Sequence, residues 1–157
     1  MNSRPEVCVD AGLAVKQVVT EPDSPRADRL FEQWGREGRR IIAPAFFQAE
    51  TDSILRKKVV LRSELTEDEA DGAFVDLQAL PIEPLSVRGE RERAWEIARE
   101  FGFPTVYDAV YLALADLRGC EFWTADERLF NRVKDRLPFV RWLGDYVPPA
   151  GLSRGAP

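Results

Sequence analysis

Short apolar runs alternate with longer amphipathic segments along this chain. Runs of about five residues that are rich in β-branched and aromatic side chains are typical of buried strands. Four such runs occur, at 6–10 (EVCVD), 40–44 (RIIAP), 120–124 (CEFWT) and 139–143 (FVRWL). The segment IEPL at 82–85 is a weaker candidate for a fifth strand.

The segments between these runs have the spacing and the start signals of helices. Ser24 followed by Pro25 suits an N-cap and a first helical position, and Thr66-x-x-Glu69 fits a capping box. Pro44 ends the second strand and opens the helix that follows it. The helices predicted in this way cover 24–38, 45–60, 66–80, 89–100, 104–115 and 126–136.

Strands that alternate with helices favour a parallel sheet covered on both faces, which is a three-layer α/β/α sandwich. In folds of this class, binding sites lie at the carboxyl ends of the strands. We expect one domain over residues 1–147, followed by a flexible tail at 148–157 that is rich in Pro and Gly.

The composition narrows the possible chemistry. The chain has 157 residues and no histidine, which excludes a Ser-His-Asp triad, a Cys-His pair and an imidazole metal site. Any catalysis must therefore use carboxylates, hydroxyls, lysine or arginine, and carboxylates favour hard cations such as Mg²⁺ or Mn²⁺. Cys8 and Cys120 lie in apolar runs and form no CxxC motif, so we expect buried, reduced thiols.

Charge and hydropathy bear on location and partners. No apolar run approaches the roughly 20 residues of a membrane span, and the first residues lack a signal-peptide pattern, so a cytoplasmic location is expected. The net charge of −5 argues against a nucleic-acid binder with a generally basic surface. Basic residues nevertheless cluster at 36–40, 56–62 and 88–93, and solvated helix faces are the simplest interpretation of each cluster.

The segment PTVYDAVYLALA, at 104–115, places a carboxylate in an apolar helix. Asp108 is its only charged residue, and it completes the capping-box pattern Thr105-x-x-Asp108, so it is either a helix cap or a functional group. Glu50 raises the same question, because it lies on the apolar stripe of its helix, one turn from Phe46 and from Ile54. A charge on a stripe that faces the core needs a partner or a metal.

Two further acids follow predicted strands. Asp10 ends the first strand and Asp126 comes two residues after CEFWT, where a lone Asp is most often a helix N-cap. If the two strands are neighbours, both carboxylates face the same crevice. Four carboxylates brought together would repel one another unless a divalent cation compensated them. Such a site suits metal-assisted hydrolysis of a phosphodiester.

With these motifs the chain resembles the PIN-domain ribonucleases, in particular the VapC-like toxins of type II toxin–antitoxin systems. The resemblance rests on VCVDAGLA, APAFFQAETDSILRK, PTVYDAVYLALA and CEFWTADERLFNRV, which occur in the family's order and span residues 6–143. It implies a PIN-like fold, an endoribonuclease that depends on Mg²⁺ or Mn²⁺, a homodimer, an RNA substrate and a cognate antitoxin protein.

The resemblance also implies which residues form the site. Four residues match the family's acidic positions and would bind the metal and carry the catalysis: Asp10, Glu50, Asp108 and Asp126. Thr124 matches a polar supporting position, and its hydroxyl is expected to hydrogen-bond a site carboxylate or a metal-bound water. Arg56 and Lys57 are the first choice for contacts with RNA phosphates, because they follow Glu50 on one helix.

One position departs from the family pattern, and other interpretations were weighed. The family often has a Ser or Thr one or two residues after the first acid, whereas this chain has Ala11 and Gly12. Phosphatases of the haloacid-dehalogenase type need a second Asp at position 12, and response-regulator receivers need paired acids after the first strand. The stronger alternative is a catalytically inactive PIN-like protein that acts as a binding or regulatory partner, although retention of all four acids opposes it.

Overall fold

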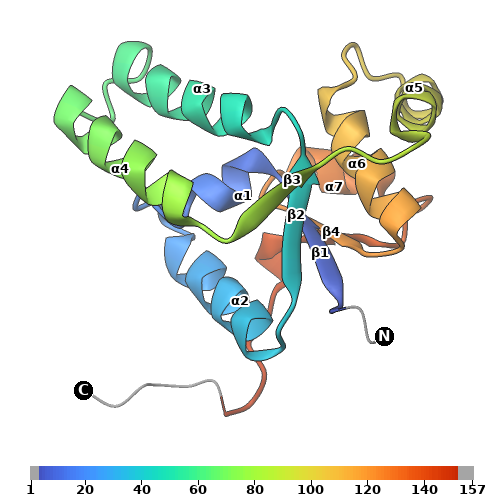
Figure 1. The fold of residues 1–157 in the computed structure, drawn as a ribbon, viewed down its shortest axis with the longest axis horizontal. Helices are drawn as coiled ribbons and strands as arrows, with labels where there is room; N and C mark the ends of the chain where they lie inside the picture. Colours follow the sequence, from blue (N-terminus) through green and yellow to red (C-terminus); the bar gives the residue numbers. More distant parts are fainter. Residues whose placement is uncertain (1–3, 152–157) are drawn as a thin grey trace.

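The computed structural model describes residues 4–151, and within this range the chain forms a five-stranded sheet in which every strand pairing is parallel (Figure 1). The strands are β1 (Glu6–Val9), β2 (Arg40–Pro44), β3 (Ile82–Leu85), β4 (Glu121–Thr124) and β5 (Val140–Trp142). The helices are α1 (Ala11–Val15), α2 (Ser24–Arg36), α3 (Phe47–Val60), α4 (Glu67–Ala79), α5 (Glu90–Phe101), α6 (Tyr107–Arg118) and α7 (Glu127–Val133), and a 3-10 turn, η1, covers Leu143–Asp145.

The order of the strands places β1 at the centre of the sheet. The order is β3-β2-β1-β4-β5. Strands β2 and β3 lie on one side of β1, and β4 and β5 lie on the other. Cys8 lies opposite Ile42 of β2 and opposite Phe122 of β4. The strand order therefore reverses between β1 and β4, and the crevice of such a fold opens beyond the carboxyl ends of these two strands.

The core consists of two main clusters, one on each face of the sheet, because successive side chains of a strand point to opposite faces. Val7 and Val9 of β1 pack on one face with Leu30 and Trp34 of α2. On the other face Cys8 packs against α5, α6 and α7. The predicted three-layer sandwich is thus confirmed.

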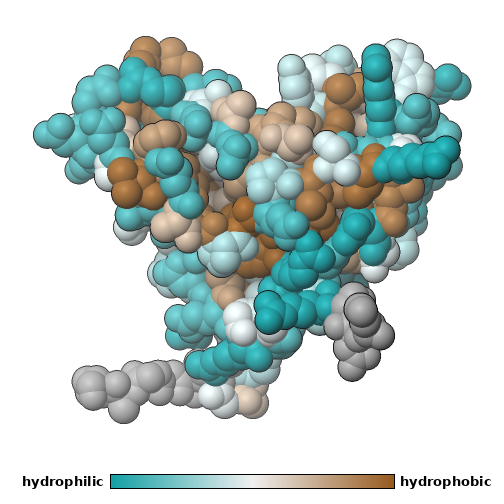
Figure 2. All heavy atoms as spheres, viewed as in Figure 1, coloured by the Kyte–Doolittle hydropathy of each residue, from teal (hydrophilic) through white to brown (hydrophobic). Residues whose placement is uncertain are grey.

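Helices α3 and α4 form a hairpin that stands over α1 (Figure 1). A smaller apolar cluster holds the three helices together, with Val15 from α1, Leu55 from α3 and Ala73 from α4. In the space-filling view of Figure 2, this hairpin and the region of α5 form two lobes with a hollow between them. The sheet thus positions α1 below the hairpin, at the end where β1 and β4 stop.

Most of the elements predicted from the sequence are present. All five predicted strands form, including the weaker candidate IEPL, and Thr66 and Glu69 make both hydrogen bonds of the predicted capping box. Helix α1 was not predicted. The first helical residue after Pro44 is Phe47, and the N-cap of α2 is Asp23, while Ser24 accepts a hydrogen bond from the backbone N–H of Glu21.

The capping-box interpretation of Asp108 is wrong. Helix α6 begins at Tyr107, one residue later than an N-cap at Thr105 would require, and its N-cap is Val106, which makes no side-chain cap. Asp108 is therefore the second residue of the helix, and Thr105 lies one residue before the N-cap, outside the capping position.

Cys8 and Cys120 are both free thiols. No helix within residues 4–151 is both long enough and apolar enough to cross a membrane. Of the tail predicted at 148–157, residues 152–157 lie outside the described residues.

Candidate active site: a cavity with four carboxylates

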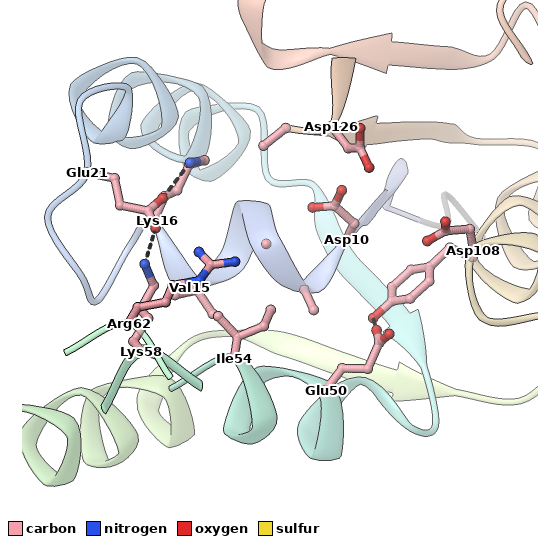
Figure 3. Close-up of a pocket in the computed structure, with 14 residues that line it drawn as sticks. Asp10, Val15, Lys16, Glu21, Glu50, Ile54, Lys58, Arg62, Asp108 and Asp126 are labelled. Atoms are coloured by element: carbon pink, nitrogen blue, oxygen red, sulfur yellow. Dashed lines mark hydrogen bonds and ion pairs between the residues drawn. The ribbon is translucent and has the colours of Figure 1, made fainter. Parts of the chain in front are cut away.

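A cavity of about 580 Å³ opens at the carboxyl ends of β1 and β4, where the strand order reverses. Figure 3 shows the side chains that line it. The four acidic residues expected to form the site all belong to this lining: Asp10, Glu50, Asp108 and Asp126. They come from four different segments of the chain, so the fold brings them together.

Asp10 is held at the end of β1 by two hydrogen bonds. Its Oδ1 accepts from the backbone N–H of Leu13 at 2.7 Å, which caps α1, and its Oδ2 accepts from the hydroxyl of Thr124. Burial raises the pKa of Asp10 to about 6, and the nearby carboxylates of Asp108 and Asp126 act in the same direction against these two hydrogen bonds. A carboxyl that resists ionisation in this way favours a nearby cation.

Thr124 links the ends of the two central strands. Its side chain is fully buried, its hydroxyl donates to Asp10, and its Oγ1 accepts from the backbone N–H of Asp126 at 2.9 Å. The hydrogen bond expected of this hydroxyl is therefore present. Thr124 supplies Asp10 with the hydroxyl partner that Ala11 and Gly12 cannot provide.

Asp126 caps a helix and also lines the cavity. Its Oδ1 accepts from the backbone N–H groups of Arg128 at 2.9 Å and Leu129 at 3.1 Å, so it is the N-cap of α7, as is usual for a lone Asp after a strand. The same residue lines the cavity and faces Asp10 in Figure 3. Capping fixes the orientation of the carboxyl group, and the two interpretations of this residue are compatible.

Asp108 enters the cavity from the first turn of α6. It remains open to solvent, yet the surrounding protein desolvates its carboxylate and raises its pKa, and the charge of Asp126 adds to this effect. Because the helix N-terminus by itself would favour the charged form, the net upward shift indicates that burial and the second carboxylate dominate.

Glu50 has a partner that was not predicted from the sequence. The hydroxyl of Tyr111 donates to its Oε2 at 2.5 Å, and Phe46 packs edge-on against the ring of Tyr111 with centroids 5.5 Å apart. Burial raises the pKa of Glu50, as does the charge of Asp108, whereas the bond from Tyr111 opposes the shift. Tyr111 lies three residues after Asp108 on the same face of α6, and this spacing could have placed it near the site, although not as the partner of Glu50.

The opposite end of the cavity is lined by basic residues. Lys16, Lys58 and Arg62 lie there, together with Glu21, which accepts from both lysines. Lys58 and Arg62 belong to the basic cluster at 56–62, whereas no sequence pattern marks Lys16 or Glu21 as part of a site.

The two basic residues expected to contact RNA lie outside this lining. Arg56 pairs with Glu67 of α4 at 2.6 Å, and both side chains are exposed. Lys57 is also absent from the residues that line the cavity within the described range, although its charge lowers the pKa of Glu50. The structure thus brings the four acids and Thr124 together and leaves Arg56 and Lys57 beside the site.

The donor groups fit a hard divalent cation in their chemistry. All four are carboxylates, and three of them have a raised pKa because the surrounding protein desolvates them and a neighbouring carboxylate adds to the shift. Within residues 4–151, no three side chains of the acidic, histidine or cysteine type stand close enough to hold one ion as they are placed. The carboxyls of Asp10, Glu50 and Asp126 each accept a hydrogen bond from a separate partner.

Comparison with known protein families gives a match over most of the chain. A sequence profile described as PIN domain matches residues 7–136, which covers most of the chain and all four acids. No protein with curated annotation matches the chain significantly.

Proposed function

The chain belongs to the PIN domain family, whose members are in general nucleases, and from this premise we propose that it is a metal-dependent endoribonuclease. The observation that carries the proposal is the gathering of Asp10, Glu50, Asp108 and Asp126 in one cavity at the switch point of the sheet. Acids that are costly to bury together are retained most readily where they bind a cation.

Asp10, Asp108 and Asp126 would hold Mg²⁺ or Mn²⁺, with Glu50 as a further ligand or as the group that orients the attacking water. The bound cation would make the water more acidic and would neutralise charge on the phosphate. The upward pKa shifts of Asp10, Glu50 and Asp108 support this assignment, because each carboxylate would gain from a neighbouring positive charge.

The chain's own residues prepare the site in three ways. Thr124 fixes the orientation of Asp10 through its hydroxyl. The amides at the start of α7 fix Asp126, and the buried hydroxyl of Tyr111 fixes Glu50. Orientation of this kind is what second partners of metal-binding carboxylates provide.

The resemblance to VapC-like toxins supports a more specific role. We propose that the chain is the toxin of a toxin–antitoxin pair, that it cleaves RNA in the cytoplasm as a homodimer, and that a cognate antitoxin inhibits it. Arg56 and Lys57 stay candidates for contacts with RNA outside the cavity. The alternative is a catalytically inactive member of the family that binds a partner, for which the separate engagement of the carboxyls is the relevant observation.

The first experiment measures cleavage of a labelled single-stranded RNA by the wild type and by Asp108→Asn, each in chelator and in millimolar Mg²⁺ or Mn²⁺. We expect the wild type to cleave only with metal and the variant to lose more than about 100-fold in rate, which exceeds the loss when an outer partner of a metal ligand is removed. Asp52→Asn is the matched control, because Asp52 lies on α3 outside the cavity lining.

Thermal unfolding in the same buffers separates the two functions. Metal should raise the unfolding midpoint of the wild type, since a ligand that binds only the folded state stabilises it, and should affect Asp108→Asn far less. Metal binding without cleavage of any RNA would favour the binding role. Cleavage that persists in chelator, or in Asp108→Asn, would refute the proposed mechanism.

A further inference from the structure

The cavity of the proposed site has two ends of opposite charge. In Figure 3 the four carboxylates gather at one end, while Lys16, Lys58 and Arg62 lie at the other. The wall formed by α3 runs between them, because Glu50, Ile54 and Lys58 follow one another on one face of that helix. Eight residues of helix span about 12 Å. Along this wall the backbone positions of the acidic end and the basic end are therefore about two helical turns apart.

Two of the three cations already have carboxylate partners. Lys16 contacts Glu21 and also Asp23, at 2.7 Å, and Lys58 contacts Glu21 at 2.7 Å and Glu64 at 2.8 Å. The lysine side chains retain only 12% and 6% of their exposure. They connect the segment between α1 and α2 to α3, and their charges are compensated.

Arg62 differs from both lysines. Its side chain is 62% exposed, and within residues 4–151 its carboxylate contact is Glu64 at 3.9 Å, the same group that Lys58 holds at 2.8 Å. Its backbone N–H donates to the carbonyl of Lys57 at 3.1 Å, which anchors the residue at the end of α3. The backbone of Arg62 is therefore held in place while its guanidinium stays accessible. The guanidinium has the planar set of donors that suits a phosphate.

The floor of the cavity leaves a path from the carboxylates to Arg62. Gly12 of α1 lies on this floor, and a Cβ added there would meet only the Oδ1 of Asp10, at 3.8 Å. Val15 and Ile54 line the middle of the cavity, between the charged ends. An RNA strand that followed this path would pass over small and apolar side chains before it reached the guanidinium of Arg62.

We propose that Arg62 binds a backbone phosphate of the substrate other than the phosphate that is cleaved. This inference rests on the proposed function, and it adds that the RNA strand crosses the cavity from the carboxylates to the end of α3. A mononucleotide or a small phosphate ester would fill the acidic end and leave Arg62 without a ligand.

The test measures binding of a fluorescent single-stranded RNA of about twelve nucleotides in chelator, over a series of salt concentrations. We expect Arg62→Gln to weaken binding about fivefold and to reduce the slope of log affinity against log salt by about 0.7, the value for one phosphate contact on a single strand. Arg62→Lys should restore most of the slope. The matched control is Arg136→Gln, because Arg136 is 66% exposed and pairs with Glu100. Arg136 follows the C-terminal end of α7, whereas Asp126 of the cavity caps the N-terminal end.

The outcomes separate the inference from the function on which it rests. Unchanged unfolding midpoints with a reduced slope for Arg62→Gln alone would support the contact. Equal losses in Arg62→Gln and Arg136→Gln, or a larger loss in Arg56→Gln than in Arg62→Gln, would overturn it while leaving RNA as a ligand. A wild type that binds no RNA in chelator but cleaves it with metal would overturn the contact alone, and a wild type that neither binds RNA nor cleaves it with metal would overturn both the contact and the proposed RNA substrate.

Discussion

Two acids of the site each cap a helix and also line the cavity. Asp126 caps α7 and lines the cavity, and Asp10 caps α1 and faces the other acids. Their positions could be predicted, because each follows a strand that the sequence pattern identifies. Tyr111 could not be predicted as the partner of Glu50, since the two residues are 61 positions apart and their contact depends on how α3 meets α6.

The raised pKa of Asp108 predicts how its replacement changes stability. The folded state binds the proton more tightly than the unfolded chain, for which the ordinary value is 3.8. The contribution of Asp108 to the free energy of unfolding therefore falls as the pH rises through the interval between the two pKa values. In chelator, Asp108→Asn should match the wild type at about pH 3 and be more stable at pH 7.

Urea unfolding over this pH range checks the prediction, with Asp52→Asn as the control on α3. A variant that is less stable than the wild type at every pH would mean that Asp108 stabilises the start of α6 as an anion. The helix dipole would then outweigh burial and the charge of Asp126.

The bond from Tyr111 to Glu50 predicts a second effect at this scale. Tyr111→Phe removes the hydroxyl and leaves the ring that packs on Phe46 and Phe122. We expect the cleavage rate to fall about 10- to 100-fold, as for other partners that orient a ligand. The fall should occur in the rate at saturating RNA, with the midpoint of thermal unfolding lowered by a few degrees at most. A rate equal to that of the wild type would show that Glu50 needs no fixed orientation.

Among the elements, the contrast between α1 and α3 shows what a sequence pattern can and cannot reveal. Helix α3 has fourteen residues and was predicted from its pattern, whereas α1 has five, AGLAV, which is too short for periodicity to show. Helix α1 forms because Asp10 caps it and because Leu13 and Val15 are buried by its neighbours. Tertiary packing determines such a helix, so a single sequence gives little sign of it.

The ion pairs of Glu21, which join the segment between α1 and α2 to α3, predict the effect of removing a charge from the cavity wall. Glu21→Gln would leave Lys16 and Lys58, both nearly buried, with one carboxylate fewer each. We expect a loss of about 1 to 3 kcal/mol in the free energy of unfolding at pH 7, since a buried charge that loses its partner is costly.

The matched control is Glu67→Gln, which removes the exposed partner of Arg56 and should change stability little. The pKa of Glu21 is lowered by its two lysines against the effect of burial. The difference between wild type and Glu21→Gln should therefore be present at neutral pH and disappear as the pH falls below the lowered pKa. Equal stability of wild type and Glu21→Gln at pH 7 would contradict the role given to this contact.

At the scale of the whole molecule, the alternation of strands and helices was sufficient to predict a parallel three-layer sheet. The order of the strands was not contained in that pattern, because it depends on which strand pairs with the central β1. The sequence argument could only state that Asp10 and Asp126 would meet if their strands were neighbours. The pairing of Val9 with Trp123 fulfils that condition.

Hydrophobic side chains also gather on the surface, at the outer end of the α3–α4 lobe in Figure 2. Val60 and Leu61 at the end of α3 are 64% and 72% exposed, and Phe74 and Val75 of α4 are exposed as well. Patches of this kind often mark contacts with other proteins.

The central place of β1 has a consequence for synthesis on the ribosome. Residues 6–9 leave the exit tunnel early, but their neighbour β4 is translated more than 110 residues later, and Asp126 follows it. At elongation rates of about 5 to 20 residues per second, several seconds pass during which Asp10 has no strand beside it and no second acid from β4. The four acids therefore come together only after most of the domain has been translated.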